Sequence, residues 1–326
     1  MSSAGITSRM AGLGMVLLGA AACSSDPARS STPEPKTPAS KKDDTGFVAA
    51  PASAERAQLS LDEFVLEPGG EIYKCQNFAN PFGRDVALLQ TQSVMSSGSH
   101  HLAVFRIEDG GNGIIEDCSG LEFHATVHAA QTPTARTLFP EGVGAFLGRS
   151  EGVRLNAHYF NLSQDTIHAK VTVALDGVDP GAVESVAAQI YLNDSTLNIP
   201  PGAGKGGGTM QLPAEVSGVK LVSAQSHMHR RGVRFESTLE DGTPLYEAST
   251  WSEPPTKTFD PPLALPDSAR ISWTCEYQND TASRLTFGES AATNEMCVFT
   301  GFYYPAPGGQ MIVGDLSGGT SAGLFK

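Results

Sequence analysis

Side chains that bind soft and borderline metal ions stand in four short motifs of this chain. The motifs are His100-His101, His158 in Asn-Ala-His-Tyr, His227-Met228-His229, and Met296 in Glu-Met-Cys. Imidazole and thioether together suit copper, which must be held in two oxidation states if it is to do redox work. The grouping favours two sites, an all-histidine set early in the chain and a His, His, Met set late. Two coppers with different ligands indicate an oxidoreductase.

The His-Met-His motif has the clearest local geometry. Because side chains on a strand alternate between faces, His227 and His229 project together and can bind one ion from a single strand. Met228 then points the other way, and we interpret it as core packing.

The adjacent pair His100-His101 has a different requirement. On a regular strand the two side chains face apart, so joint ligation needs a β-bulge or a strand end. The preceding Ser96-Ser-Gly-Ser could supply that irregularity. His158 lies in the strand-like run Arg154-Leu-Asn-Ala-His-Tyr-Phe and could complete a three-histidine site.

Met296 is the least obvious candidate, because a methionine is usually a flexible filler of the core. Its neighbour Cys297 strengthens it, since a disulfide there would fix its position. One His-His or His-x-His pair among eight histidines is weak evidence alone. Only the joint occurrence of the four motifs makes copper the preferred interpretation.

Length, composition and net charge restrict the class of protein. A chain of 326 residues exceeds the usual size of a single domain, so two domains are expected. Glycine (35) and proline (21) favour many turns and an all-β chain. The net charge of -13 argues against nucleic acid and against an anionic lipid surface as partners.

The N-terminus has the features of a targeting segment. Arg9 precedes an apolar run, residues 10–22, that is too short for a permanent membrane span. Small residues directly before Cys23 predict a bacterial lipoprotein signal over residues 1–22, with lipidation of Cys23. The alternative is an ordinary secretory peptide with an incidental cysteine. We expect an exported lipoprotein of the outer membrane, facing the periplasm or the cell surface, with no membrane contact except the lipid anchor.

The next segment has almost no large apolar side chains. Residues 23–55 are rich in Ser, Pro, Ala, Lys and Asp, so we predict a disordered tether. The folded part then divides into an N-terminal domain, residues 56–179, and a C-terminal domain, residues 180–326.

Four cysteines remain once Cys23 is set aside: Cys75, Cys118, Cys275 and Cys297. They allow three pairings, and the large sequence gap makes Cys75–Cys118 with Cys275–Cys297 the simplest. An oxidising compartment would keep both bonds formed. Four unpaired buried thiols are the alternative.

Short strand-like runs broken by Gly, Pro, Asn and Asp fill the chain from Leu59 onward. No long amphipathic helical repeat interrupts them, and Asp241-Gly242 between two such runs predicts a hairpin. The pattern predicts an all-β fold of two antiparallel β-sandwich domains in tandem, jelly-roll-like in type. We interpret the glycine-rich residues 200–208 as a loop inside the second domain; they lack the order of a phosphate-binding loop.

The motifs resemble those of the copper type II, ascorbate-dependent monooxygenases, the family of peptidylglycine α-hydroxylating monooxygenase and dopamine β-monooxygenase. The resemblance runs from about Tyr73 to Tyr304. The matching motifs, in family order and with similar gaps, are His100-His101, Ala157-His158-Tyr159, His227-Met228-His229 and Glu295-Met296-Cys297. The pairs Cys75–Cys118 and Cys275–Cys297 match two family disulfides, and other disulfides of the animal enzymes have no counterpart here.

The resemblance implies two copper ions per chain. His100, His101 and His158 would hold an electron-transfer copper in the first domain. The catalytic copper of the second domain would be held by His227, His229 and Met296. A solvent-filled cleft would separate the sites, and ascorbate or a similar reductant with O2 would hydroxylate a C–H bond of a small organic substrate.

Three departures from the family pattern concern the substrate. Peptide-amidating members carry an arginine two residues before His-x-His, an asparagine directly after Met-Cys and a tyrosine two residues further on. This chain has Gln225, Val298 and Thr300. A peptide carboxylate is therefore poorly supported, and we expect a less charged or more apolar substrate.

The remaining histidines and four aromatic residues are interpreted as structural and not as part of a site. His124 and His128 are spaced for one helical face, yet we interpret them as surface or loop residues. His168 is predicted to face solvent from a strand. We expect four aromatic residues in the core: Trp251, Trp273, Tyr303 and Tyr304.

Three functions compete. The first is an exported copper monooxygenase. The second is an exported copper-binding or copper-delivery lipoprotein without hydroxylase activity. The third is an adhesion or carbohydrate-binding sandwich with coincidental motifs, which the complete set of six ligands argues against.

Overall fold

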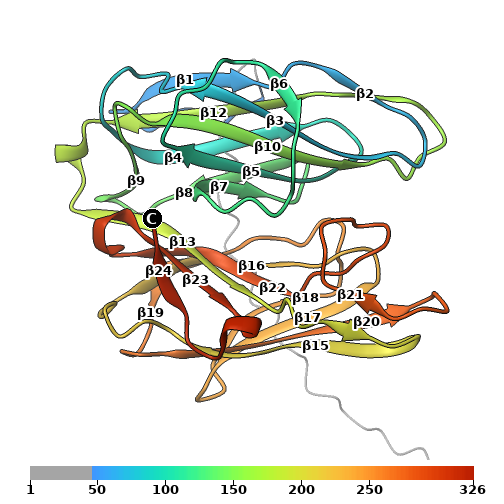
Figure 1. The fold of residues 1–326 in the computed structure, drawn as a ribbon. Coiled ribbons are helices and arrows are strands. Elements are labelled where there is room, and N and C mark those ends of the chain that lie inside the picture. Colours follow the sequence, from blue (N-terminus) through green and yellow to red (C-terminus); the bar gives the residue numbers. More distant parts are fainter. Residues whose placement is uncertain (1–45) are drawn as a thin grey trace, which may run out of the picture. The chain divides into compact units, whose positions relative to one another are not determined.

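Residues 46–326 are described by a computed structural model, and their regular elements are β-strands and three single-turn 3-10 helices. The predicted all-β class is confirmed, and the strands form two stacked sandwiches (Figure 1). No helix of these residues is long and apolar enough to cross a membrane. The short helices are η1 (Pro180–Ala182), η2 (Pro307–Gly309) and η3 (Leu316–Gly318).

The N-terminal half, strands β1 to β12, has two layers. One layer contains β1 (Glu55–Ser60), β12 (Val171–Val178), β4 (Val86–Met95), β9 (Val143–Leu147) and β8 (Thr134–Leu138). The other contains β6 (Ile115–Asp117), β3 (Glu71–Ala79), β10 (Gly152–Phe160), β5 (Ser99–Ile107) and β7 (Ala125–Ala130). A short pair lies beside them, β2 (Phe64–Leu66) and β11 (Ile167–Ala169).

The C-terminal half repeats this arrangement. One layer contains β13 (Ser185–Asn193), β22 (Val298–Tyr304), β16 (Lys220–His227), β19 (Lys257–Ala264), β23 (Met311–Asp315) and β24 (Gly323–Phe325). The other contains β15 (Gly202–Gln211), β20 (Arg270–Asn279), β17 (Gly232–Leu239) and β18 (Pro244–Ala248). Its short pair is β14 (Asn198–Ile199) and β21 (Leu285–Thr286). The β17–β18 pair is the hairpin predicted at Asp241-Gly242.

A single sheet of 11 strands runs through both halves. The connection is a parallel pairing of β9 with β13, in which Val143 lies opposite Ser185 and Ala145 opposite Ala187. The pairing joins the first layer of each half edge to edge, so the two sandwiches share backbone hydrogen bonds.

Each half has its own hydrophobic core. Leu88, Val104 and Leu155 are fully buried in the N-terminal core, and Phe235 and Phe299 in the C-terminal one. The two cores divide inside β13, where Ala187 packs into the first and Ala188 into the second. This division lies close to the predicted change of domain at residues 179 and 180.

The folded body begins earlier than the predicted tether allows. Phe47 is buried, and the Val48 amide donates a hydrogen bond to Gln92 on β4 at 2.8 Å. Residues 46–55 therefore belong to the body, because Phe47 is buried in it and both backbone groups of Val48 bond to Gln92. The signal peptide, Cys23 and the rest of the tether lie outside the described residues.

The glycine-rich segment is a strand and not the predicted loop. Residues 202–208 lie in β15, which pairs with β20 along its whole length. A Cβ atom on Gly206 would lie 2.1 Å from the Leu197 side chain, and one on Gly207 would lie 2.3 Å from the Trp273 carbonyl oxygen. Glycine at these positions lets neighbouring groups approach the strand closely, a common reason for glycine within a sheet.

The disulfide prediction is confirmed: Cys75 is bonded to Cys118, and Cys275 to Cys297. Trp273 and Tyr303 are buried in the C-terminal core, as predicted. His168 is exposed on β11, as predicted, and lies 2.9 Å from Glu63.

His128 contradicts the prediction of a surface or loop residue. It is fully buried on β7, with Nε2 2.9 Å from the Ser93 hydroxyl and Nδ1 2.8 Å from the Thr137 hydroxyl. Neighbouring hydroxyls satisfy both nitrogens, so a core position is tolerated. Burial lowers the pKa of His128 to about 3. His124 is half-buried, with its ring 5.5 Å from that of Phe105.

His128 should make the metal-free protein sensitive to acid. Its folded pKa of about 3 lies below the ordinary unfolded value, so between the two the unfolded chain binds a proton that the folded chain does not. The free energy of unfolding therefore falls as the pH drops from about 6.5 toward 3. The variant His128→Gln lacks this proton uptake. Its slope of unfolding free energy against pH should therefore be smaller by up to about 1.4 kcal/mol per pH unit, the value for one proton.

Urea unfolding at pH 4 to 7 measures the two slopes. His168→Gln, which changes an exposed histidine, is the control and should leave the slope unchanged. Equal slopes for wild type and His128→Gln would exclude this contribution.

Candidate metal centre

A β-bulge brings the two adjacent histidines of β5 together. In the pairing of β5 with β10, His101 lies opposite His158 and Ser99 opposite Tyr159, so His100 is the extra residue. The ring centroids of His100 and His101 are 5.2 Å apart. The irregularity that joint ligation requires is present, and it lies at His100 itself, directly after the Ser96-Ser-Gly-Ser run that the sequence predicts to supply it.

His158 projects from the face of β10 that lies away from the core. Val153, Leu155 and Ala157 alternate into the N-terminal core, which leaves His158 on the opposite face. Its ring stacks on Tyr73, with centroids 3.9 Å apart and planes inclined by 10°. Its Nε2 donates to the Glu71 carboxylate at 2.9 Å, so its Nδ1 carries the lone pair.

His227 and His229 lie where β16 ends. His227 is the last residue of the strand and His229 follows it, with ring centroids 5.2 Å apart. Met228 is buried in the C-terminal core, as predicted. The His229 amide donates to Glu295 at 3.0 Å, which holds the chain after the strand in place.

The five imidazoles form one cluster. The ring of His227 lies 5.1 Å from that of His100 and 4.9 Å from that of His101, and His229 lies 5.5 Å from His100. Donor atoms of His100, His101 and His227 all lie within 4.8 Å of one another, and this set mixes the two predicted triads. A solvent-filled cleft between the two ligand groups is therefore a wrong prediction. The ligand-bearing face of β5 and β10 packs directly against the end of β16.

The cluster contains buried nitrogen atoms that have no hydrogen-bond partner among residues 46–326. They are His100 Nδ1 and Nε2, His101 Nδ1, His158 Nδ1, His227 Nε2 and His229 Nε2. A buried nitrogen left unpaired costs about 1–3 kcal/mol, so such atoms are rare in folded proteins. Because a neutral imidazole carries one lone pair, these atoms offer five lone pairs, one from each ring, and a metal ion would take those that converge on it.

The outer nitrogens of three rings are fixed by hydrogen bonds. Gln131 donates its amide to the Ser226 carbonyl, so its Oε1 accepts from His227 Nδ1 at 2.6 Å. The Asn294 carbonyl accepts from His229 Nδ1 at 3.3 Å. With Glu71 on His158, these contacts set the tautomers and point the free nitrogens inward, as the outer partners of metal-bound histidines do.

The cluster is electrically neutral at physiological pH. Burial lowers the pKa of all five imidazoles, to about 3 for His227, although Glu71 partly opposes this at His158. Burial raises the pKa of Glu71, but hydrogen bonds from His158, Ser290 and Ala291 outweigh it and lower the value to about 2. Uncharged rings keep the lone pairs that ligation needs.

Met296 is buried and lines a cavity that His101 and His227 also line. The Tyr277 hydroxyl donates to its carbonyl at 2.7 Å, and the Trp273 indole donates to that of Cys297 at 3.2 Å. Together with the Cys275–Cys297 bond, these contacts fix the backbone of Met296. Burial raises the pKa of Glu295 to about 7, although amide donors lower it.

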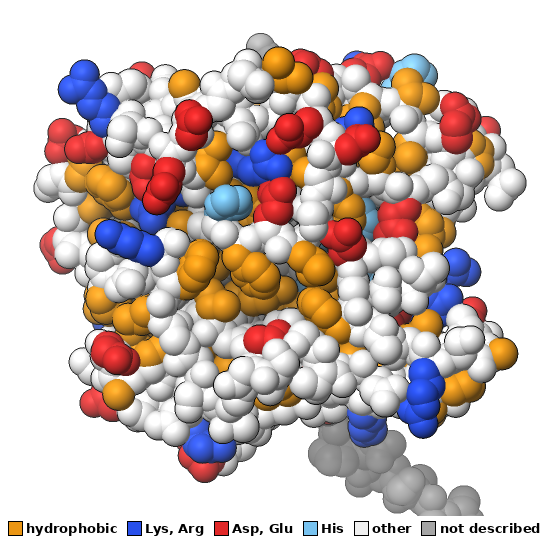
Figure 2. Space-filling view, in the orientation of Figure 1, with side chains coloured by type: hydrophobic (Ala, Val, Ile, Leu, Met, Phe, Trp, Pro, Cys, Tyr) orange, Lys and Arg blue, Asp and Glu red, His pale blue; other side chains and the backbone are white. Residues whose placement is uncertain are grey.

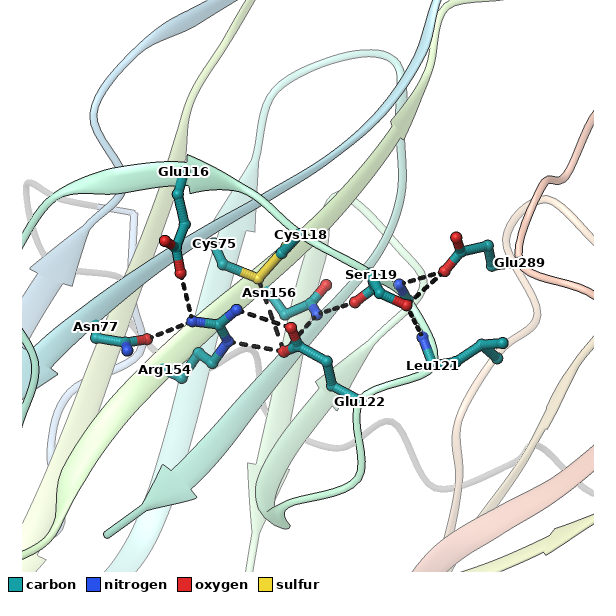
Figure 3. A network of polar contacts seen from close by, with 11 residues as sticks. Cys75, Asn77, Glu116, Cys118, Ser119, Leu121, Glu122, Arg154, Asn156 and Glu289 are labelled. Atoms are coloured by element: carbon teal, nitrogen blue, oxygen red, sulfur yellow. Dashed lines mark hydrogen bonds and ion pairs between the residues drawn. A yellow bond between two sulfur atoms is a disulfide. The ribbon is translucent and has the colours of Figure 1, made fainter. Parts of the chain in front are cut away.

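A loop of the C-terminal half, residues 287–296, fastens onto the N-terminal half. The Glu289 carboxylate accepts from the Ser119 hydroxyl at 2.7 Å, and its carbonyl accepts from the Tyr73 hydroxyl at 2.8 Å. Ser290 donates to the second oxygen of Glu71 at 2.7 Å. Figure 3 shows Glu289 meeting Ser119 beside the Cys75–Cys118 bond. One loop therefore supports ligands of both halves.

An ion pair holds the segment that carries Ser119. Arg154 on β10 bonds both oxygens of Glu122, at 2.7 and 2.8 Å, and also Glu116 at 3.1 Å (Figure 3). A Cβ atom on Gly120 would lie 2.4 Å from the Tyr73 ring, so glycine is required where this segment crosses the support of His158.

Sequence reasoning missed the residues that orient the ligands. Glu71, Gln131 and Glu295 have no local signature, and Glu71 precedes its partner by 87 residues. Trp251 is predicted in the core, but it is only partly buried and packs against the C-terminal core from outside. Its ring lies 5.4 Å from that of His100. Tyr304 is also half-exposed.

Glu71→Gln should weaken metal binding. The Glu71 carboxylate accepts hydrogen bonds from His158, from the Ser290 hydroxyl and from the Ala291 amide. A glutamine side chain keeps only one oxygen acceptor. We expect affinity for Cu(II) to fall by about 10–100-fold, the usual effect of losing an outer partner of a metal-bound histidine. Titration against a competing chelator measures it.

Glu63→Gln is the matched control, because Glu63 makes the same kind of contact to the exposed His168. Its affinity for Cu(II) should equal that of wild type. Equal losses in the two variants would contradict a specific role of Glu71.

Comparisons with known proteins add no assignment. No family model matches the chain, and no curated protein matches it. Among solved structures, the major capsid protein P2 of bacteriophage PM2 has a TM-score of 0.32 at 10% identity, covering 76% of this chain and 97% of that one. The PBSX exported protein XepA has a TM-score of 0.20 at 10% identity, covering 80% and 97%. An oxalate decarboxylase variant from Bacillus subtilis has 0.18 at 8% identity, covering 72% of each chain. Such low scores carry no argument about function.

Proposed function

We propose that this protein is a copper-dependent monooxygenase that hydroxylates a C–H bond of a small organic substrate. The observation that carries the proposal is the set of unpaired, inward-facing imidazole nitrogens beside a cavity that Met296 lines. The motif resemblance to the copper type II, ascorbate-dependent monooxygenases supports the same reaction. The proposal includes export as a lipoprotein tethered through Cys23.

The donor set suits copper among the common metals. Neutral imidazoles bind Cu(II) and Cu(I), and a thioether favours Cu(I). No carboxylate oxygen is part of the donor set of His100, His101 and His227, which disfavours calcium, magnesium and manganese. Bound copper would supply the one-electron chemistry that activates O2.

The reaction balances with a one-electron reductant. The substrate C–H bond and one atom of O2 give a hydroxyl group, while the other atom, two electrons and two protons give water. Two molecules of ascorbate or a similar reductant supply the electrons. The protein's part is to orient three of the five rings through Glu71, Gln131 and the Asn294 carbonyl, and to exclude water from the buried rings of His100, His158 and His229.

The alternative function, copper binding or delivery without hydroxylation, is favoured by one observation. Donors from both predicted triads lie within 4.8 Å of one another, which is close to the spacing around a single ion. Nitrogen ligands lie about 2.0 Å from a metal, so two of them on one ion are at most about 4 Å apart. The number of ions therefore discriminates between the two functions.

The first prediction of this proposal concerns stoichiometry and turnover. Metal analysis of copper-loaded protein should give two ions per chain, and an oxygen electrode should record ascorbate-dependent O2 uptake that increases with some members of a substrate library. One ion per chain and no stimulated uptake would instead support copper delivery.

The second prediction concerns the thioether. Met296→Leu keeps the bulk of the side chain but removes sulfur, and it should reduce kcat/KM by about 100-fold or more, since a direct ligand matters at least as much as its outer partners. Met228→Leu is the matched control, because Met228 packs in the core and such swaps are well tolerated. Full activity in Met296→Leu would remove Met296 from the site.

A further inference from the structure

The cavity beside the histidine cluster lies between facing layers of the two halves. Figure 2 shows hydrophobic side chains gathered around a hollow in the middle of one face. Its walls come from β5 and β7 on one side and from β13, β22 and β16 on the other. Its volume is about 110 Å³. An apolar cavity of about 150 Å³ is known to take benzene, so this smaller one sets an upper limit of about one small ring.

Strand alternation extends the cavity directly from the candidate ligands. On β5, Ala103 and Phe105 follow His101 on the same face, and all three line the cavity. Ala103 lies opposite Ala129 of β7, so two small side chains leave room next to His101. A ligand in this space lies beside the metal-binding nitrogens.

The opposite wall follows the same rule. Val298 lies opposite His227, and in the next row Thr300 lies between Gln225 and Tyr191. Adjacent rows on one face are about 7 Å apart. The cavity therefore has an apolar end at Val298 and Met296, with a row of neutral polar side chains one step away.

The lining offers no free charge to a substrate. Within the part of the chain that the structure describes, the lining contains no lysine or arginine, and its one carboxylate, Glu122, is bonded on both oxygens by Arg154. The Thr300 hydroxyl donates to the Ile190 carbonyl and accepts from Gln189, while the Gln225 amide donates to the Pro254 carbonyl. His124 is the only lining histidine outside the five-membered cluster.

We propose that this cavity takes an uncharged, mainly apolar substrate of about one ring, or one such end of a longer molecule. This inference rests on the proposed function, because it names the class of substrate for that site. Burial of an unpaired carboxylate or ammonium would cost several kcal/mol with nothing in the lining to offset it. The positions that would grip a peptide carboxylate in the resembled family are Gln225, Val298 and Thr300, and all three line this cavity.

The rim of the cavity is also apolar. Leu121 and Phe123 also line the cavity, with 38% and 46% of their surface exposed. The Cys75–Cys118 bond and the Arg154–Glu122 ion pair fix the segment that carries them. An apolar substrate longer than one ring has a hydrophobic surface to lie on as it leaves the cavity.

The test compares three probes of the same size that differ in charge: phenylacetamide, phenylacetate and 2-phenylethylammonium. Calorimetric titration of the full protein, with and without copper, measures their affinities. Phenylacetamide should bind at least about tenfold more tightly than either ion, a difference of about 1.4 kcal/mol. Equal or tighter binding of either ion to the copper-free protein would overturn the inference.

Two variants locate the binding. Ala129→Phe fills the cavity and should abolish binding of phenylacetamide while copper content stays that of wild type. Ala52→Phe adds the same ring at an exposed position and should change neither. Unchanged binding in Ala129→Phe would place the probe elsewhere and overturn the inference.

The outcome is separable from that of the proposed function, because binding is read without turnover. Preference for phenylacetamide without any hydroxylation would sustain the cavity inference and reject the monooxygenase. Hydroxylation of a charged substrate would sustain the monooxygenase and reject the cavity inference.

Discussion

Five imidazole rings packed against one another, three of them fully buried, impose the constraint on which the rest of this structure depends. Each presents a lone pair to a region where no protein donor reaches, at a cost of about 1–3 kcal/mol per nitrogen. The surrounding fold offsets that cost through two separate hydrophobic cores and two disulfides. A metal ion would convert the same lone pairs from a destabilising feature into ligands, which makes folding and metal binding thermodynamically linked.

The support of the cluster divides into two kinds of contact. Strand pairing and the bulge at His100 decide where the rings are, whereas Glu71, Gln131 and the Asn294 carbonyl decide which nitrogen faces inward. The second kind comes from segments remote in sequence from the ligands. The loop that follows β21 supplies two contacts of the second kind, since Ser290 and Ala291 donate to Glu71 and the Asn294 carbonyl accepts from His229.

Local rules of strand geometry account for what the sequence predicts correctly. Alternation places Met228 in the core, and adjacent histidines at 100 and 101 require the bulge that is present. The errors arise where distant segments meet. The burial of His128 depends on Ser93 and Thr137, the strand at 202–208 on β20, and the merging of two ligand groups on the packing of two sandwiches. No periodicity in one segment contains that information.

The parallel pairing of β9 with β13 has a mechanical consequence for the cluster. Because one sheet passes through both sandwiches, the halves are not joined by a free hinge. Any movement that draws His227 away from His100 must bend this sheet or break its hydrogen bonds, and must also release Glu289 and Ser290 from the N-terminal half. The spacing of the imidazoles is thus tied to the elasticity of the backbone, and a twist of the sheet far from the rings would change the distance between them.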